Sequence, residues 1–454
     1  MKPKQEHHVG AANGPGNLLV LGGLSLVVGA ISGLVGAVFR LVLASADRLR
    51  DALVSWAHLE SAGGFLLVTV TCAAATGIAA WLVRRFAPHA SGSGIPHVES
   101  VLKEELRPAP FLLIPVKFLG GVLAIGSGLA LGREGPSVQI GASLGHLVGT
   151  LFRRNWPDSR VLLAAGAGAG LATAFNAPIA GAVFVLEELV RRFETRIAIA
   201  ALGASATAMS VARLFLGDAP EFQVEPFRYA GGEGTTLSFV LGGFAGILAV
   251  AYNGAVVGAI AATSRLDRWA IEARAAVVGA MVGMLAWFSP ELVGGGEPLT
   301  ERTLAGTVAL GVLPFAFLLR FGLGAVSYAA RTPGGLFAPM LLLVAQVGLL
   351  FGTMCRLVHP GLDTPPEAFA VIGMAAFFTG TVRSPVTGIV LIIEMTASFT
   401  MLLPMLGACF TAMLVPTLLC SPPIYDSLRE RPISDQDLSG AGTAQSEINP
   451  PSGP

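Results

Sequence analysis

The chain has 454 residues, of which 53% are hydrophobic and only 13% are charged, and its formal net charge is +0. A soluble domain carries about 25% charged residues, so this composition excludes an ordinary soluble domain and predicts an integral membrane protein. Aromatic residues make up only 7% of the chain, and its apolar runs are long and do not alternate, which argues against a β-barrel. The neutral charge balance gives no reason to expect a nucleic-acid partner.

Residues 1–17 form a polar leader, and the first apolar run, from Asn17 to Ala44, is too long for the core of a secretory signal. We therefore predict that this run is the first membrane helix. The four cysteines lie in or at the end of apolar runs and lack metal-ligand spacing, which favours free buried thiols and no metal or cofactor. They are Cys72, Cys355, Cys409 and Cys420.

Further apolar runs follow, and Gly and Pro interrupt many of them. Several are shorter than the ~20 residues that a membrane span needs, and others are long enough for two helices. This pattern predicts an all-α polytopic membrane protein with tilted, discontinuous helices around a site at the membrane midplane. The runs lie at about 65–86, 110–131, 138–152, 161–190, 196–216, 237–263, 272–289, 303–328, 336–357, 368–380 and 386–420.

The chain contains an internal repeat. The block from Gly166 to Glu187 aligns with the block from Gly373 to Glu394 at a constant spacing of 207 residues (394 − 187). An inverted repeat with the site between its halves is the expectation, although sequence similarity leaves a parallel repeat open. The predicted parts are the leader 1–17, a first repeat 18–216, a linker 217–236, a second repeat 237–421, and a C-terminal segment 422–454 whose tail is expected to be disordered.

An acidic side chain interrupts the apolar pattern at Glu134, in the stretch Gly132-Arg133-Glu134-Gly135-Pro136. Gly followed by Pro predicts the start of a helix, so Glu134 should lie at a helix N-terminus at membrane depth. A carboxylate costs several kcal/mol there and calls for a functional reason. Because helix N-termini stabilise anions, we infer that the Glu134 carboxylate occupies a place that a mobile anion can also take.

Three further stretches have similar Gly and Pro punctuation: Gly92 to Pro96, Gly334 to Pro339, and Pro422 to Tyr425. The first two predict turns that present backbone N–H groups at helix starts. Ser93 and Tyr425 add hydroxyl donors. Neutral donors that converge on one point would hold an anion without trapping it, although Ser93 as a helix cap and Tyr425 as an interfacial aromatic are the ordinary alternatives.

Together, and in the order in which they follow along the chain, these four stretches resemble the signature of the CLC chloride channel and transporter family, over roughly residues 20 to 430. The resemblance implies a fold of two inverted halves, assembled as a homodimer in which each subunit has its own ion pathway. It implies that chloride is bound by the Ser93 and Tyr425 hydroxyls and by the turns that contain Gly94, Ile95, Leu336 and Phe337. No cofactor is implied.

The resemblance also assigns two acidic residues to proton coupling. Glu134 would be the gating glutamate, which blocks the path when ionised and swings out when protonated. Glu188 would transfer protons inside the protein, and its desolvation in an apolar helix would favour its neutral form. Because passive channels of the family typically lack an acid at the position of Glu188, its presence favours exchange of chloride for protons over simple conduction.

Other polar residues receive structural interpretations. Glu187 is expected to be a packing or helix-end residue, and Arg133 could form an ion pair with Glu134 that would make both structural. From the matching family positions, Lys117 and Glu99 are expected to form a buried pair. His97 stands where relatives often carry an acid and is expected to lie in a solvated loop, whereas Arg331 has no explanation at this level.

These observations predict a dimeric chloride/proton antiporter and not an enzyme. Basic residues near the outer segments predict that both termini lie in the cytoplasm, and the resemblance implies a prokaryotic inner membrane. A passive chloride channel is the main alternative, and a fluoride/proton antiporter is less favoured because Ser93 matches the chloride-type motif. A membrane enzyme with Glu134 as general acid lacks a second catalytic group, and a structural scaffold would not need acids at this depth.

Overall fold

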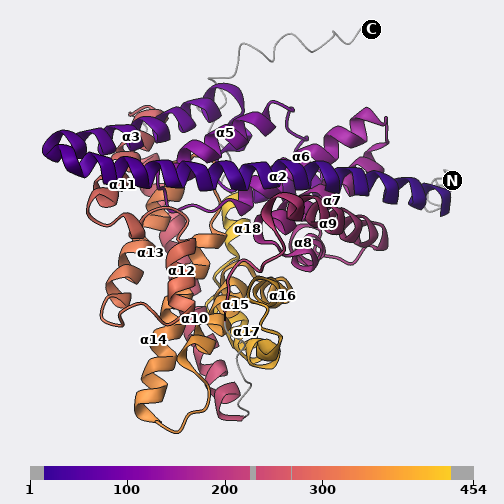
Figure 1. The fold of residues 1–454 in the computed structure, drawn as a ribbon. Helices are drawn as coiled ribbons and strands as arrows, with labels where there is room; N and C mark the ends of the chain where they lie inside the picture. The colour runs from indigo at the N-terminus through magenta and orange to yellow at the C-terminus, as the bar shows by residue number, and fades with distance from the viewer. Residues whose placement is uncertain (1–14, 225–231, 267, 431–454) are drawn as a thin grey trace.

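The computed structural model describes residues 15–224, 232–266 and 268–430. The predicted leader and the C-terminal tail lie almost entirely outside these residues. The described chain is nearly all helical, as predicted (Figure 1). Its long helices are α2 (Pro15–Ala57), α3 (Ser61–Phe86), α5 (Leu113–Gly126), α6 (Glu134–Leu151), α7 (Trp156–Phe175), α9 (Thr195–Leu216), α10 (Gly232–Ser264), α11 (Ile271–Phe288), α13 (Leu313–Ala329), α14 (Phe337–Val358), α15 (Pro366–Val382), α16 (Pro385–Thr396) and α17 (Leu402–Leu418).

Short helices stand between them, which confirms the expected discontinuous pattern. They are α4 (Ile95–Leu102), α8 (Pro178–Phe184), the π-helical turn Val185–Leu189, α12 (Glu297–Leu304) and α18 (Ile424–Arg429). Gly and Pro explain most of the breaks. For example, Asn176 ends α7 in the left-handed conformation and Pro178 begins α8, as expected for a C-cap followed by a helix start. The apolar run 386–420 contains two helices, α16 and α17.

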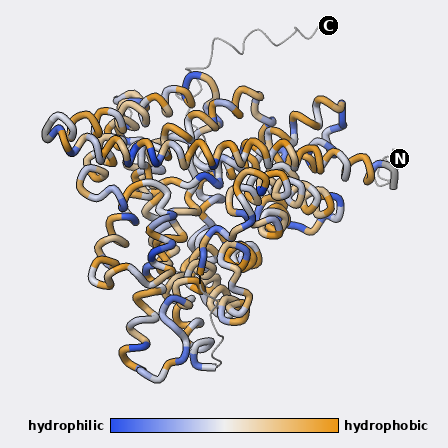
Figure 2. Tube along the Cα trace, viewed as in Figure 1, coloured by the Kyte–Doolittle hydropathy of each residue, from blue (hydrophilic) through white to orange (hydrophobic). Residues whose placement is uncertain are grey.

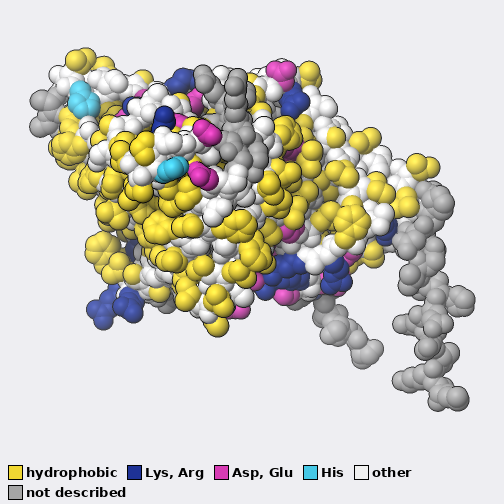
Figure 3. All heavy atoms as spheres, turned by 90° about the horizontal axis from the view of Figure 1, so that it is seen from below, with side chains coloured by type: hydrophobic (Ala, Val, Ile, Leu, Met, Phe, Trp, Pro, Cys, Tyr) yellow, Lys and Arg dark blue, Asp and Glu magenta, His cyan; other side chains and the backbone are white. Residues whose placement is uncertain are grey.

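Hydrophobic residues dominate the exterior as well as the core. Within the described residues, seven helices are long and apolar enough to cross a membrane. The hydropathy colouring follows the helices, with hydrophilic residues mainly near their ends and in turns (Figure 2). The view from below shows a largely hydrophobic surface with charged groups in small clusters (Figure 3). Exposed residues such as Phe315 and Leu318, 64% and 69% accessible, are typical of a lipid-facing surface.

The repeat noticed in the sequence appears as repeated packing. In the first half, Gly29 and Gly33 of α2 lie against the backbone of α9 at Ala204 and Ala208. In the second half, Gly242 and Gly246 of α10 lie in the same way against α17 at Ala408 and Ala412. A side chain at any of these glycines would collide with the partner helix, so small residues permit the close approach that membrane helices use.

The two halves are inverted relative to each other. Glu187, beyond the end of α8, accepts hydrogen bonds from the backbone N–H groups of Val386 (3.0 Å) and Thr387 (2.6 Å) at the start of α16. Glu394, near the end of α16, accepts from those of Ile179 (3.0 Å) and Ala180 (2.7 Å) at the start of α8. Each carboxylate therefore caps the other helix, so α8 and α16 run antiparallel, which an inverted repeat requires.

Candidate functional site

Three of the glycine-rich loops meet at the centre of the molecule. The backbone of Gly92 bonds to both Thr332 and Gly334 (3.1 and 3.0 Å), and Gly132 and Gly335 exchange two backbone hydrogen bonds (2.9 and 2.7 Å). These contacts are the only isolated β-bridges in the described part of the chain. The loops bring the starts of α4, α6 and α14 together, so their unpaired N–H groups converge on one region.

Glu134 begins α6, as the Gly-Pro signal predicts, and its side chain is fully buried. Its Oε1 accepts a hydrogen bond of 2.6 Å from the backbone N–H of Phe337, the first residue of α14, and lies 3.4 Å from the N–H of Ala338. The carboxylate therefore occupies a helix N-terminus, where partial positive charge and free N–H groups stabilise an anion. The predicted helix start at Glu134 is confirmed, and the carboxylate contacts the start of a second helix, α14.

Ser93 and Tyr425 are also fully buried and belong to the same region. Their hydroxyl oxygens and Oε2 of Glu134 have no hydrogen-bond partner among the described residues. Ser93 lies against Gly135, where an added Cβ would come within 2.5 Å of its Oγ, and the ring of Tyr425 lies 5.9 Å from that of Phe337. Because buried hydroxyls normally find a partner, these donors fit an anion-binding role.

The backbone of the predicted binding turns has the expected form. Gly94 has φ +83°, a left-handed conformation that favours glycine, and it caps α4, which begins at Ile95. Leu336 caps α14 directly ahead of Phe337. Ile95, Leu336 and Phe337 are all fully buried. The structure thus brings every residue predicted to bind chloride to the starts of α4, α6, α14 and α18.

Glu188 lies in the π-helical turn, and its side chain is only 3% exposed. Its Oε2 accepts a hydrogen bond of 2.6 Å from the hydroxyl of Ser384, and its Oε1 lies 3.4 Å from the guanidinium of Arg191. Glu188 also lines an open cavity of about 630 Å³, together with Arg191 and Arg383. A buried carboxylate beside a hydroxyl and an open cavity has the geometry that a proton relay needs.

The predicted pair of Lys117 and Glu99 does not form. Lys117 is fully buried in α5, and its Nζ donates to the backbone carbonyls of Ala90 (3.0 Å) and Gly92 (2.7 Å). Lys117 therefore fixes the turn that carries Ser93, because the carbonyls of that turn offer it acceptors at closer range than any carboxylate.

Glu99 pairs with other cations near the C-terminal helix. Its carboxylate contacts Lys103 (2.7 Å), Arg191 (3.3 Å) and Arg429 (3.1 Å). The cluster links α4, the loop after Glu188 and α18, which carries Tyr425. Glu99 thus pairs with three other cations and not with Lys117.

Arg133 is likewise not paired with Glu134. Its guanidinium donates to the carbonyl of Ala174 (3.0 Å) and to the carboxylate of Glu221, and it forms an ion pair with Glu297 (3.3 Å). Glu221 also binds Arg40 at 2.7 Å. Burial would raise the pKa of Glu221, but the two guanidiniums outweigh it and hold this pKa below its ordinary range.

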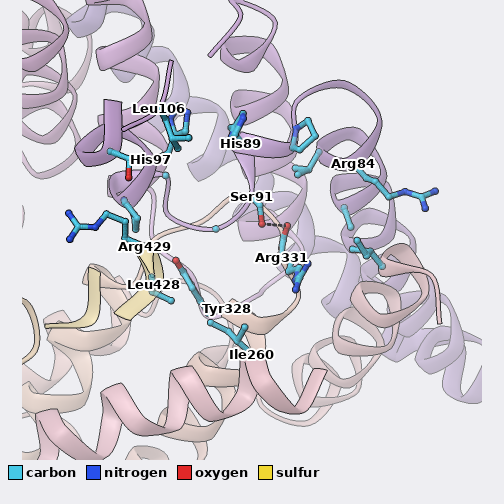
Figure 4. A pocket seen from close by; sticks show the side chains of 18 residues that line it. Arg84, His89, Ser91, His97, Leu106, Ile260, Tyr328, Arg331, Leu428 and Arg429 are labelled. Atoms are coloured by element: carbon cyan, nitrogen blue, oxygen red, sulfur yellow. Dashed lines mark hydrogen bonds between the residues drawn. The ribbon is translucent and has the colours of Figure 1, made fainter. Parts of the chain in front are cut away.

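A second cavity, of about 260 Å³, reaches the Gly92–Gly94 turn from one side (Figure 4). His97 lies in its wall, where its Nδ1 is 3.3 Å from the amide of Gln139, so it is not in a free solvated loop. Arg331 has φ +56°, and its carbonyl accepts from Ser91. Among the residues that the structure describes, the cavity is lined by Arg84, His89, His97, Arg331 and Arg429 but by no Asp or Glu, a distribution that attracts anions.

Sequence reasoning missed several residues of this region. Arg320 of α13 donates to the carbonyls of Leu292 (3.1 Å) and Gly294 (2.8 Å), as Lys117 does one repeat earlier. The stretch Gly294–Pro298 stands in the second half where Gly92–Pro96 stands in the first, and both turns contain a left-handed glycine. Gly294 follows Gly92 by 202 residues (294 − 92) and Arg320 follows Lys117 by 203 (320 − 117), close to the 207 of the later block, so the repeat could have identified both. Ser384 and Glu221 gave no such signal.

Comparisons with known proteins agree with this geometry. The family model described as "Voltage gated chloride channel" matches residues 75–417. The H(+)/Cl(-) exchange transporter ClcA of Salmonella gallinarum is 38% identical over 382 residues, which cover 82% of this chain and 80% of the relative. The chain belongs to the CLC family.

Solved structures extend the comparison to the CLC fold. A slow cyanobacterial Cl−/H+ antiporter matches with a TM-score of 0.85 and 32% identity, over 90% of this chain and 96% of that protein. A eukaryotic CLC transporter matches with a TM-score of 0.78 at 23% identity, over 91% of this chain and 74% of that one. A CLC-type fluoride/proton antiporter matches with 0.77 at 22%, over 91% and 99%. These last two show the fold alone.

Proposed function

We propose that this CLC protein exchanges chloride for protons across a membrane. The observation that supports this most directly is the Glu134 carboxylate at the start of α14, beside the unpartnered hydroxyls of Ser93 and Tyr425. Similar proteins named as an H(+)/Cl(-) exchange transporter and as a Cl−/H+ antiporter support chloride and protons as the two transported ions.

The geometry couples the two ions by competition. A chloride ion and the Glu134 carboxylate would use the same N–H group of Phe337, so both cannot be bound there at once. Protonation removes the negative charge of Glu134 and so weakens its hold on the helix start, which favours chloride. By linkage, each ion then alters the binding of the other to the same degree.

Two separate openings suit two different ions. The cavity at the Gly92–Gly94 turn, with basic and no acidic lining residues, would admit chloride. The cavity beside Glu188 would admit protons, which Ser384 and Glu188 could pass inward. Side chains that titrate are needed only on the proton route.

The test is paired ion flux in proteoliposomes. A chloride gradient should drive proton movement, and Glu134→Gln should abolish that movement while chloride flux continues. Glu105→Gln, which changes an exposed carboxylate, should leave both fluxes as they are. Proton movement that survives in Glu134→Gln would refute the role of Glu134.

The alternatives give different results in the same system. A passive channel would show a reversal potential that ignores a pH gradient, whereas an exchanger would respond to it. A fluoride/proton antiporter would carry fluoride well and chloride poorly. If neither chloride nor fluoride moved, the exchanger, the passive channel and the fluoride antiporter would all be excluded.

We further propose a homodimer in a prokaryotic inner membrane, with both termini in the cytoplasm and no enzymatic activity. Exposed apolar residues on α9 and α17, such as Leu202 (53%) and Phe410 (60%), could lie against a second copy or lipid. Cross-linking in native membranes distinguishes these, because a monomer would give no cross-linked pair. Reporter fusions at each end test the orientation.

A further inference from the structure

Residues 217–224, the described part of the linker that follows α9, form a strap beside Arg133 and Glu134. Asn176, which ends α7, donates from its side-chain amide to the carbonyl of Ala219 at 2.5 Å. The N–H of Phe222 donates to the carbonyl of Met395 at the end of α16 (2.9 Å), and the ring of Phe222 is 4% exposed. The strap is therefore fixed to both halves, and Glu221 is held between these two anchors.

Glu221 completes a group of four charges next to the gate. Its carboxylate binds Arg40 of α2 and Arg133, the residue before Glu134, and Arg133 also contacts Glu297. Two cations and two anions give this group a net charge of zero. The side chain of Glu221 is 9% exposed and that of Arg133 is 12% exposed, so solvent screens their interaction only partly.

The group borders the place where the Glu134 carboxylate binds. A small cavity of about 10 Å³, roughly the room for one water molecule, is lined by Arg133, Glu221, Glu297 and Ala338. Ala338 is also the residue whose N–H lies 3.4 Å from Oε1 of Glu134. A charge on Glu221 is therefore felt close to the anion position.

We propose that Glu221 is a positioning residue that lowers the affinity of the site for chloride arriving from the strap side. It does so by neutralising Arg40 and Arg133, of which Arg133 borders the start of α14, where chloride would bind. Weak binding on the strap side of the site lets chloride leave, as conduction requires. This role rests on the proposed chloride exchange, because it sets the affinity of one step of that exchange.

A charge series tests the proposal. Glu221→Gln keeps the size of the side chain and gives the group a net charge of +1, whereas Arg40→Gln gives −1. One unit of charge at this range, partly screened, should change the apparent Km for chloride by about fivefold. We expect Glu221→Gln to lower the Km, Arg40→Gln to raise it, and the double variant to return it close to that of the wild type.

The measurement uses proteoliposomes of uniform orientation, with chloride varied on one face at a time. The shift should appear on the strap face only, and the number of protons exchanged per chloride should stay constant. Asp218→Asn, which removes an exposed charge from the same strap, is the matched control and should shift the Km by less than twofold.

The possible outcomes separate the role of Glu221 from the function itself. If the wild type carries no chloride, the proposed function fails, whatever Glu221 does. If the wild type exchanges ions but both single variants shift the Km in one direction, or Glu221→Gln matches Asp218→Asn, Glu221 acts only structurally and the proposal is overturned. If Glu221→Gln does not fold, Arg40→Gln decides alone: a Km that does not rise overturns the proposal.

Discussion

Three buried or half-buried glutamates, Glu134, Glu187 and Glu188, illustrate how the surroundings of a carboxylate decide what it can do. Glu134 is bound by a backbone N–H at a helix start, and Glu188 by the hydroxyl of Ser384 beside an open cavity. Glu187, next in sequence to Glu188, is held by two backbone N–H groups of α16. Glu187 also accepts from the hydroxyl of Thr387 (2.7 Å) and lines the same cavity, but its two backbone hydrogen bonds tie it to the start of α16. Within the described residues Glu188 caps no helix, and we therefore propose Glu188 as the proton carrier.

This difference predicts different effects for two adjacent substitutions. Glu188→Gln should reduce proton movement driven by a chloride gradient by about a hundredfold or more, since a hundredfold is the low end of what a positioned acid–base group contributes, while chloride flux continues. Glu187→Gln should keep proton movement within about twofold, since its effect would fall on a helix cap of modest strength. Equal loss of coupling in both variants would contradict the assignment of the relay to Glu188.

The sequence predicted single positions in this site better than it predicted pairs. Pro136 and the glycines around Glu134 predict a helix start there, because Pro and Gly act through their own backbone geometry. The predicted pairing of Lys117 with Glu99 was wrong, because Lys117 donates to the backbone carbonyls of Ala90 and Gly92. Every residue has a backbone carbonyl, so the sequence gives no signal for such an acceptor. Glu221 lies in the predicted linker 217–236 and drew no prediction of its own, because only the folded strap brings it to Arg133.

At the scale of elements, α8 and α16 are joined by their reciprocal caps. The sequence repeat predicted that Glu187 and Glu394 are equivalent, and the structure shows that each binds the other half. Inversion could not be read from the sequence, since a parallel repeat gives the same alignment. The meeting of Gly132 with Gly335, far apart in the chain, likewise depends on the tertiary fold.

The caps predict an effect on stability that is separate from transport. Glu394→Ala leaves two N–H groups at the start of α8 without their acceptor, and loss of a helix cap costs about 1–2 kcal/mol. The melting temperature of the purified protein should therefore fall, while the number of protons exchanged per chloride stays unchanged. Glu233→Ala, an exposed change at the start of α10, serves as the control. A Glu394→Ala protein as stable as this control would contradict the capping role.

At the scale of the whole molecule, the four-charge group helps to hold the two halves together. Arg40 and Arg133 belong to the first half, Glu297 to the second, and Glu221 to the strap between them. Because the pKa of Glu221 is lowered in the folded protein, its ionised form stabilises the fold. This contribution is present above the pKa of an unfolded glutamate and is lost as the pH falls through the lower, folded value.

Acid should therefore weaken the wild type more than a variant that lacks this charge. At pH 7, we expect Glu221→Gln to melt several degrees below the wild type, and we expect this difference to shrink as the pH falls below about 4, where an ordinary glutamate becomes protonated. Melting curves of both proteins in detergent between pH 3 and 8 provide the measurement. A gap that stays constant across this range would show that the charge of Glu221 does not stabilise the fold.

The reciprocal caps also bear on how the chain is made. During synthesis, the N–H of Ala180 at the start of α8 is made before its acceptor Glu394, which follows 214 residues later (394 − 180). At about 5–20 residues per second of synthesis, the ribosome needs roughly 10–40 s to deliver it. During that time the newly inserted first half must persist in the lipid with open N–H groups, so biogenesis of this protein depends on a half-built intermediate surviving until its second half arrives.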